Sequence, residues 1–140
     1  MTRDCPFCAI VAGADAAIVT ESHRAVAFLD RAPANDGHTL VVPRAHARDI
    51  WDLTPEDGAE VWGLAREVAQ RIKFVFEPDG LTLAQANGEA AGQDVFHFHL
   101  HVIPRWRGDG FVRHWRPKRD ATDLSSVAAQ LRNVEPDALA

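Results

Sequence analysis

The clearest pattern along the chain is an alternation of histidine with apolar residues. His97, His99 and His101 occupy every second position of an apolar run. Because successive side chains of an extended strand point to opposite faces, this spacing predicts a strand over 95–103 with three imidazoles on one side, stepped by roughly 6.6 Å. The other side would carry Phe96, Phe98, Leu100 and Val102. Such a strand presents ring nitrogens to a metal ion or to an anion such as phosphate.

Shorter apolar runs predict the other strands. Runs rich in apolar and β-branched residues are bounded by turn residues, which favours strands over 17–21, 25–30, 37–43 and 81–86. A short polar segment separates the first two runs, so these are expected to form a hairpin. The glycine-containing segment 87–94 is expected to be a loop that leads directly into the histidine strand.

Helical periodicity predicts two helices. Thr54 has the residue type of an N-cap, a proline and two acidic residues follow it, and apolar residues recur at helical spacing to about Glu77. A shorter stretch over 122–132 has the same periodicity. By contrast, 105–118 is expected to be an irregular surface segment and 133–140 a loose tail.

These elements predict an α+β fold, with a mainly antiparallel sheet of about five strands, one long helix packed on it and a short C-terminal helix. At 140 residues the chain is expected to be a single domain with a sizeable core. Fifteen basic residues against twenty acidic ones give a formal net charge of -5, which argues against a nucleic-acid partner. The sequence shows no membrane span and no signal-peptide core, so we expect a cytoplasmic protein with no membrane partner.

The two cysteines, Cys5 and Cys8, form a Cys-Pro-Phe-Cys motif. In a reducing compartment such a pair favours a metal or redox function over a structural disulfide. A glutaredoxin-type redox site would follow a first strand, whereas only four residues precede Cys5. Zinc needs four ligands, and His46 and one of the alternating histidines are candidates. Free, buried thiols remain the alternative.

The sequence resembles the histidine triad (HIT) family. The resemblance rests on the segment 97–103, on the Ala-Gly-Gln at 91–93 and on the upstream run 37–46. It is closest to the Hint branch, specifically its bacterial members with a Cys-x-x-Cys start, and it runs from Cys5 to about Arg105. It implies the HIT fold, a nucleotide substrate and a homodimer.

The resemblance also implies a chemistry for the histidines. Family members are nucleotidyl hydrolases or transferases whose central triad histidine, here His99, attacks the α-phosphorus of a nucleoside monophosphate derivative. A neutral imidazole, with a solution pKa of about 6.5, is nucleophilic at neutral pH. Its second nitrogen must be protonated and held, for which a backbone carbonyl is suited. His101 would donate to a phosphate oxygen. His38 matches a histidine that supports the triad, although as a lone histidine it could equally be structural.

Four positions match residues that bind the nucleoside in relatives. Asp30 matches an acidic residue that accepts hydrogen bonds from both ribose hydroxyls. Phe7, Ile10 and Phe28 match apolar positions that enclose the purine. From residue type alone, all three would be assigned to the core.

The loop before the triad matches a phosphate-binding segment. The Gln93 position contacts the phosphate region in relatives, and Gly92 would let the backbone approach closely. Asp94 stands where serine or threonine is frequent, so it would contribute only its backbone. Ala86 stands where many relatives carry asparagine, and Asn87 is the candidate to compensate for its loss.

In relatives with Cys-x-x-Cys, two thiolates join the histidine of a Pro-x-x-His segment and the first triad histidine. This implies a closed, structural zinc site at Cys5, Cys8, His46 and His97, which would anchor the N-terminal segment 1–15.

The resemblance therefore implies a homodimeric phosphoramidase that hydrolyses purine nucleoside 5'-phosphoramidates, or related nucleoside monophosphate conjugates, through a nucleotidyl intermediate on His99. An alternative substrate is a dinucleoside polyphosphate such as diadenosine tetraphosphate, because a basic stretch could contact further phosphates. That stretch contains Arg105, Arg107, Arg113 and Arg116. A nucleotide-binding regulatory protein with little catalysis is an alternative of another class, and a metalloprotein with an open zinc position is a third.

Overall fold

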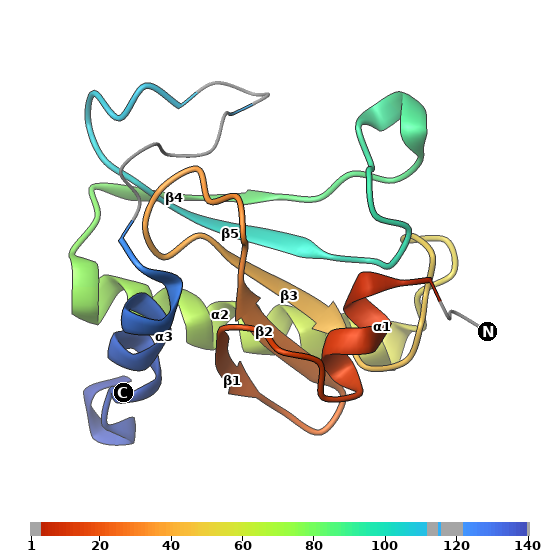
Figure 1. Ribbon diagram of the computed structural model, residues 1–140, viewed down its shortest axis with the longest axis horizontal. Helices are drawn as coiled ribbons and strands as arrows, with labels where there is room; N and C mark the ends of the chain where they lie inside the picture. The colour runs from red at the N-terminus through yellow and green to blue at the C-terminus, as the bar shows by residue number, and fades with distance from the viewer. Residues whose placement is uncertain (1–3, 112–114, 116–121, 140) are drawn as a thin grey trace.

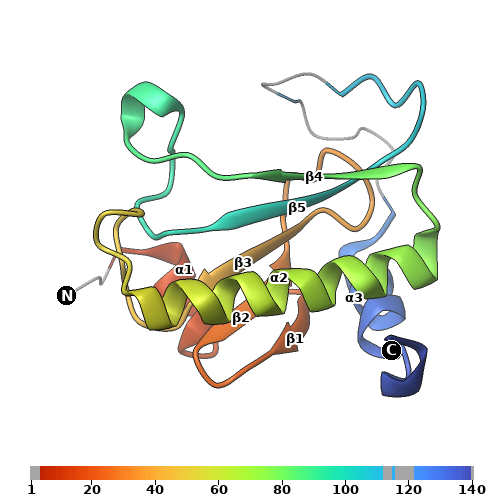
Figure 2. The ribbon, with the colours of Figure 1, turned by 180° about the vertical axis from the view of Figure 1, so that it is seen from behind.

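The computed structural model describes residues 4–111, 115 and 122–139. Over these residues the chain forms one five-stranded sheet with a long helix across one face (Figure 1, Figure 2). Every neighbouring pair of strands is antiparallel, and their order is β1-β2-β3-β5-β4. The strands are β1 (Ile18–Glu21), β2 (Ala25–Leu29), β3 (Thr39–Pro43), β4 (Gly80–Ala84) and β5 (Leu100–Arg105). The predicted α+β fold is confirmed.

The helices are α1 (Pro6–Val11), α2 (Pro55–Phe76) and α3 (Leu124–Arg132), with short 3-10 helices η1 (Glu89–Ala91) and η2 (Pro136–Leu139). Helix α2 begins as predicted, because the Thr54 side chain accepts a hydrogen bond from the Asp57 backbone N–H at 3.1 Å. It ends at Phe76, because the following residue, the C-cap Glu77, adopts a left-handed conformation that stops the helix. Within the described ranges, no helix is both long and apolar enough to cross a membrane.

The main core lies between α2 and the sheet, and Figure 2 shows α2 crossing that face. The helix contributes the periodic positions Val61, Leu64, Ala65, Val68 and Ile72, all buried. From the histidine segment, Phe98, Leu100 and Val102 enter the same core. The alternation in the sequence therefore separates two faces as predicted, with the apolar residues toward α2 and the imidazoles of His99 and His101 away from it.

The histidine segment is a strand over only part of its predicted length. Strand β5 begins one residue after His99, so the predicted strand over 95–103 is wrong in its first half. The reason is that the chain there bonds to the loop after β3 instead of to a strand. The Phe98 N–H donates to the Ala47 carbonyl at 2.7 Å, and the His97 ring turns toward the N-terminal segment.

Both ends of the described chain are held against the fold. Helix α1, which the sequence pattern did not indicate, begins with the Cys5 thiol as its N-cap. Residues 133–139, expected to be loose, instead contact α2. Val134 is buried, and the Gln70 amide donates to the Leu139 carbonyl at 2.8 Å.

Candidate functional site

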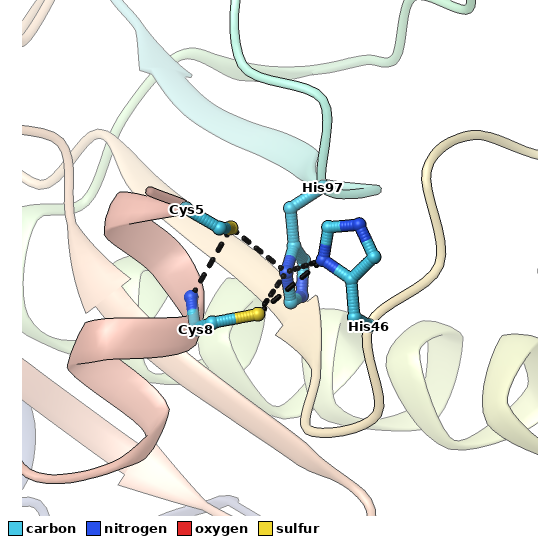
Figure 3. Close-up of side chains that lie close together, drawn as sticks. All are labelled: Cys5, Cys8, His46 and His97. Atoms are coloured by element: carbon cyan, nitrogen blue, oxygen red, sulfur yellow. Dashed lines mark hydrogen bonds between the residues drawn. The ribbon is translucent and has the colours of Figure 1, made fainter. Parts of the chain in front are cut away.

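Four potential metal ligands from three separate segments meet beside α1 (Figure 3). The Cys8 Sγ lies 3.3 Å from His46 Nδ1 and 3.4 Å from His97 Nδ1. The Cys5 Sγ lies 3.4 Å from His97 Nδ1, and the two histidine Nδ1 atoms are 3.2 Å apart. The fold thus brings together the complete ligand set that the resemblance implied.

This arrangement fits a zinc ion. Zinc–sulfur bonds of about 2.3 Å and zinc–nitrogen bonds of about 2.0–2.1 Å place tetrahedral ligand atoms about 3.3–3.8 Å apart, close to the distances observed here. His97 Nε2 lies 2.9 Å from the Pro43 carbonyl. Because a carbonyl only accepts, Nε2 carries the proton and Nδ1 is left free to bind metal. The chain has a Cys2His2 site, whose four ligands complete the tetrahedron and leave zinc a structural role.

The environment of the thiols does not favour redox chemistry. Burial raises the pKa of the Cys5 thiol above its ordinary value. Reactive redox cysteines instead have a lowered pKa, because the thiolate is the nucleophile. A metal cation would reverse this effect by stabilising the thiolate, which agrees with the zinc interpretation.

The backbone of His97 holds the next histidine of the row. His99 Nδ1 lies 2.8 Å from the His97 carbonyl oxygen. Since the carbonyl can only accept, Nδ1 carries the proton and the neutral ring keeps its lone pair on Nε2. The His99 side chain is buried, and its ring lies edge-on to Phe7 with centroids 5.1 Å apart. The structure supplies the carbonyl that a nucleophilic histidine requires.

A chain of hydrogen bonds fixes the tautomers of two further histidines. The Ala34 backbone N–H donates to His38 Nδ1 at 2.9 Å, so the proton of neutral His38 is on Nε2. That nitrogen lies 2.9 Å from His101 Nδ1 and donates to it. The proton of neutral His101 is therefore on Nε2. His101 presents an N–H donor next to His99, whose ring centroid is 5.1 Å away.

Both of these histidines are neutral at pH 7. Burial, reinforced by the neighbouring His101, lowers the pKa of His38 to about 3. Burial, reinforced by His99, lowers the pKa of His101 to about 4. The Asp30 Oδ2 atom lies 3.5 Å from His38 Nε2 and 4.0 Å from His101 Nδ1, and burial raises the pKa of this carboxyl as well. Desolvation therefore outweighs the attraction between carboxylate and imidazolium.

Asp30, His38 and His101 also lie close enough together to form a second metal site. A metal there would have to bind His38 Nε2, which carries the proton as long as Ala34 donates to Nδ1. The hydrogen-bond chain thus argues against a metal ion at this position.

The nucleoside-binding candidates lie on the face of the sheet opposite α2. Phe7 and Phe28 are buried with ring centroids 5.4 Å apart, and Ile10 packs beside them. Asp30 follows β2, and its Oδ1 accepts a hydrogen bond from the Ala32 N–H at 2.9 Å. These residues thus form an apolar cluster next to His99, with a carboxylate near the other histidines.

Gln93, the candidate for a phosphate contact, forms hydrogen bonds within its own loop and to Arg48. Its side-chain nitrogen donates to the carbonyls of Arg48 at 2.7 Å and Val95 at 3.1 Å. Its backbone N–H donates to the Gly88 carbonyl at 3.1 Å. All three donors of Gln93 are engaged, so this buried residue holds the loop and has no N–H left for a phosphate.

The other two candidates of this loop are Asn87, which is held by hydrogen bonds, and Asp94, which is exposed. The Asn87 Oδ1 accepts from the Ile50 backbone N–H at 2.7 Å and from the Gln85 amide at 2.8 Å, so this residue also ties loops together. The Asp94 residue is exposed. Ala86 leaves the Asn87 amide as the nearest substitute for the missing asparagine, but much of that amide is already engaged.

The basic stretch is only partly available for phosphates. Arg105 forms two hydrogen bonds to Asp109, at 2.8 and 3.0 Å. Arg113 and Arg116 lie outside the described residues. Sequence reasoning missed Trp115, whose ring lies against His38 and His101 at centroid distances of 5.3 and 5.1 Å. Its surroundings in the sequence have no periodicity that could have indicated this contact.

The fold and the histidine row define the class of a histidine triad domain, and comparisons with known proteins agree. The HIT domain family model matches residues 12–108. The chain is 38% identical over 134 residues to Protein hit of Bacillus subtilis, covering 92% of both chains. It is 42% identical over 136 residues to an uncharacterized HIT-like protein of Mycoplasma genitalium, covering 94% of this chain and 96% of that one.

Among solved structures, a Zn-bound histidine triad family protein from Mycobacterium smegmatis is similar over 99% of this chain and 95% of that one, with a TM-score of 0.84 and 35% identity. A HIT family protein from Bacillus anthracis has a TM-score of 0.76 and 39% identity, covering 93% of this chain and 96% of that one. The protein belongs to the HIT family, whose members are in general nucleotide hydrolases or transferases.

Loss of one zinc ligand is expected to destabilise the protein. In Cys8→Ser the hydroxyl is a poor zinc ligand, so the variant should lose its bound zinc and roughly 3 kcal/mol of unfolding free energy. Elemental analysis and urea denaturation measure both quantities. Chelator treatment should bring the wild type to the stability of the variant. A wild-type unfolding curve that chelator leaves unchanged would contradict a structural zinc.

The neutral histidines predict a pH-dependent stability. The folded pKa of His38 is about 3, whereas the unfolded value is about 6.5, so only the unfolded chain takes up this proton as the pH falls. The contribution of neutral His38 to the free energy of unfolding is therefore complete above pH 6.5 and decreases below it. Between pH 7 and 5 the wild type should lose up to about 2 kcal/mol more than His38→Asn, measured by urea denaturation. Equal losses in the two proteins would contradict a neutral His38.

Proposed function

We propose that this HIT protein hydrolyses purine nucleoside 5'-phosphoramidates through a covalent nucleotidyl intermediate on His99. The observation that carries the proposal is the hydrogen bond from His99 Nδ1 to the His97 carbonyl, at 2.8 Å. In the neutral ring it leaves the lone pair on Nε2, beside the N–H donor of His101. A lone pair next to a neutral donor is what attack on a phosphorus atom requires.

In the proposed first step, the lone pair of His99 Nε2 forms a bond to the α-phosphorus. The phosphorus–nitrogen bond to the leaving amine breaks, and its electron pair leaves with the amine, which takes a proton from solvent water. The His101 Nε2–H stabilises the charge that builds on a phosphate oxygen. The His97 carbonyl accepts from the protonated Nδ1 of the now cationic ring, so the intermediate keeps its orientation.

In the second step, a water molecule attacks the same phosphorus. The bond to His99 Nε2 breaks, and the ring recovers its lone pair. The attacking water loses one proton to solvent, which balances the proton that the amine took up, and the nucleoside monophosphate is released. Because one difficult displacement becomes two easier ones, the histidine acts as a true covalent catalyst.

The nucleoside would bind on the side of Phe7, Ile10 and Phe28, where an apolar cluster lies next to His99. The Asp30 carboxylate has two oxygens, as the two ribose hydroxyls require. The phosphate would then reach His99 and His101 from the face opposite α2.

A resident zinc is part of the proposal. The similar protein from Mycobacterium smegmatis is described as Zn-bound, and the present Cys2His2 geometry suits the same ion. Zinc, when bound, would hold α1 against His97. The side chain of His97 would bind the metal, and the backbone carbonyl of His97 holds the His99 ring. The reaction itself would then be carried out by the side chains of His99 and His101.

Dinucleoside polyphosphates are the second candidate substrate class. The Arg105 guanidinium, which could contact their additional phosphates, is paired with Asp109. This pairing favours conjugates with a single phosphate.

The protein is also proposed to form a homodimer through the exposed side of β4 and α2. Strand β4 is an edge of the sheet, so the backbone groups along its outer side have no partner strand within the described residues. Several large apolar residues of this region are exposed, namely Trp62, Phe74, Leu81 and Leu83. A second copy would cover this surface and pair the edge strand.

His99→Ala is expected to lower kcat on an adenosine phosphoramidate by about 10³-fold or more, because the covalent step is lost. Single-turnover reactions with labelled substrate, followed by mass spectrometry, should find the nucleotidyl adduct on His99 in the wild type only. Unchanged AMP affinity in the variant serves as the control for folding. A wild type that binds AMP but forms no adduct would favour a regulatory protein. Faster turnover of diadenosine tetraphosphate would favour the second substrate class.

Leu83→Glu is expected to shift the protein from dimer to monomer, because it places a charge in the proposed interface. Light scattering after size-exclusion chromatography measures the mass. Ala90→Glu, an exposed position on η1, adds the same charge elsewhere and should remain dimeric. A monomeric wild type would overturn the dimer.

A further inference from the structure

One buried amide anchors the turn that precedes His38. Asn35 is only 7% exposed. Its Nδ2 donates to the Pro104 carbonyl of β5 at 2.9 Å and to Asp109 Oδ2 at 3.0 Å. Its own backbone carbonyl accepts from the His38 N–H at 3.1 Å. The side chain therefore ties the turn between β2 and β3 to the end of β5.

The group that receives Asn35 is itself held in place. The Asp109 carboxylate accepts two hydrogen bonds from Arg105, at 2.8 and 3.0 Å, and two from the backbone N–H groups of Trp106 and Phe111, at 3.1 and 3.0 Å. The Arg105 guanidinium also lies 4.0 Å above the Phe111 ring centroid. A carboxylate with this many donors is fixed in position, so it makes a rigid anchor.

The anchored turn contains the donor that sets the histidine tautomers. Ala34 immediately precedes Asn35 and donates its N–H to His38 Nδ1 at 2.9 Å. Displacement of Asn35 would move this N–H away from the ring. The hydrogen bond from His38 Nε2 to His101 Nδ1 depends on the same donor, because it requires the proton of His38 to be on Nε2.

We propose that Asn35 is a positioning residue for the reaction at His99 and His101. By tying the turn to Pro104 and Asp109, it aims the Ala34 N–H at His38 and so keeps the proton of His101 on Nε2. Its effect on catalysis rests on the proposed function. Its effect on the tautomers does not.

Two arrangements of the shared protons compete in this pair. In one, His38 donates to His101 and His101 Nε2 is an N–H donor. In the other, His38 Nδ1 is protonated, His101 donates back from its Nδ1, and His101 Nε2 holds a lone pair that repels a phosphate oxygen. The Ala34 N–H stabilises only the first arrangement. A net hydrogen bond of about 1 kcal/mol corresponds to about a fivefold population ratio, and the repulsion of two facing N–H groups adds to it.

Ring nitrogen NMR of histidine-labelled, zinc-loaded protein tests the proposal without substrate. In the wild type at pH 7, His38 and His101 should show the Nε2–H form and His99 the Nδ1–H form. In Asn35→Ala, the His38 and His101 signals should shift toward a mixture while those of His99 stay unchanged. Asn133→Ala, at an exposed asparagine after α3, is the matched control and should leave all three as in the wild type.

Kinetics provide the second measurement. Asn35→Ala should lower kcat on an adenosine phosphoramidate by up to about fivefold, because fewer molecules hold the His101 Nε2–H form that donates to the phosphate, with KM within about twofold. Wild-type tautomers in folded Asn35→Ala would overturn the proposal. Should that variant fail to fold, Asp109→Asn is measured instead, and unchanged tautomers there would overturn it equally. If Asn35→Ala shifts the tautomers but the wild type does not hydrolyse the phosphoramidate, the effect of Asn35 on the tautomers is supported and the proposed function is wrong.

Discussion

The site depends on His97, whose ring lies among the metal ligands and whose backbone carbonyl holds His99. Its ring nitrogens face the thiols on one side and the Pro43 carbonyl on the other, while its own carbonyl holds the Nδ1 proton of His99. The residue is fully buried, so its ring and backbone cannot move independently. Metal geometry and the orientation of the His99 ring are therefore set by the same few bonds. A backbone shift that suits one of them disturbs the other.

Burial explains why His38 and His101 are neutral. Burial removes the water that would solvate a charged imidazolium, so the pKa values of His38 and His101 fall to about 3 and about 4. A neutral imidazole has one donor and one acceptor, so a hydrogen bond accepted at one nitrogen places the proton on the other. The Ala34 N–H in this way sets the donor direction of the hydrogen bonds through His38 and His101. The same low-dielectric surroundings that disfavour the charged rings also strengthen each of these hydrogen bonds. The site thus obtains its polarity from oriented N–H groups instead of from net charge.

The sequence predicted those parts of the structure that depend on periodicity. Side-chain alternation assigned Phe98 and Leu100 to the core, and helical spacing located α2. Resemblance assigned the zinc ligands, which lie far apart in the chain. The part that escaped prediction depends on which backbone group a side chain reaches. No local pattern distinguishes a Gln93 that binds ligand from one whose donors are all engaged by its own loop, and none connects Asn35 to β5.

The attachment of α1 makes the apolar cluster beside His99 dependent on the supply of zinc. This helix has only six residues, too few to be stable alone, and it brings Phe7 against the His99 ring. Its apolar contacts hold it from one side, and the two sulfur ligands fasten its first turn from the other. A freshly synthesised chain in a zinc-starved cell would keep the sheet and α2, because their core lies on the far face. Phe7 would not be fixed against the His99 ring, so the proposed binding side for the base would form only as the metal becomes available.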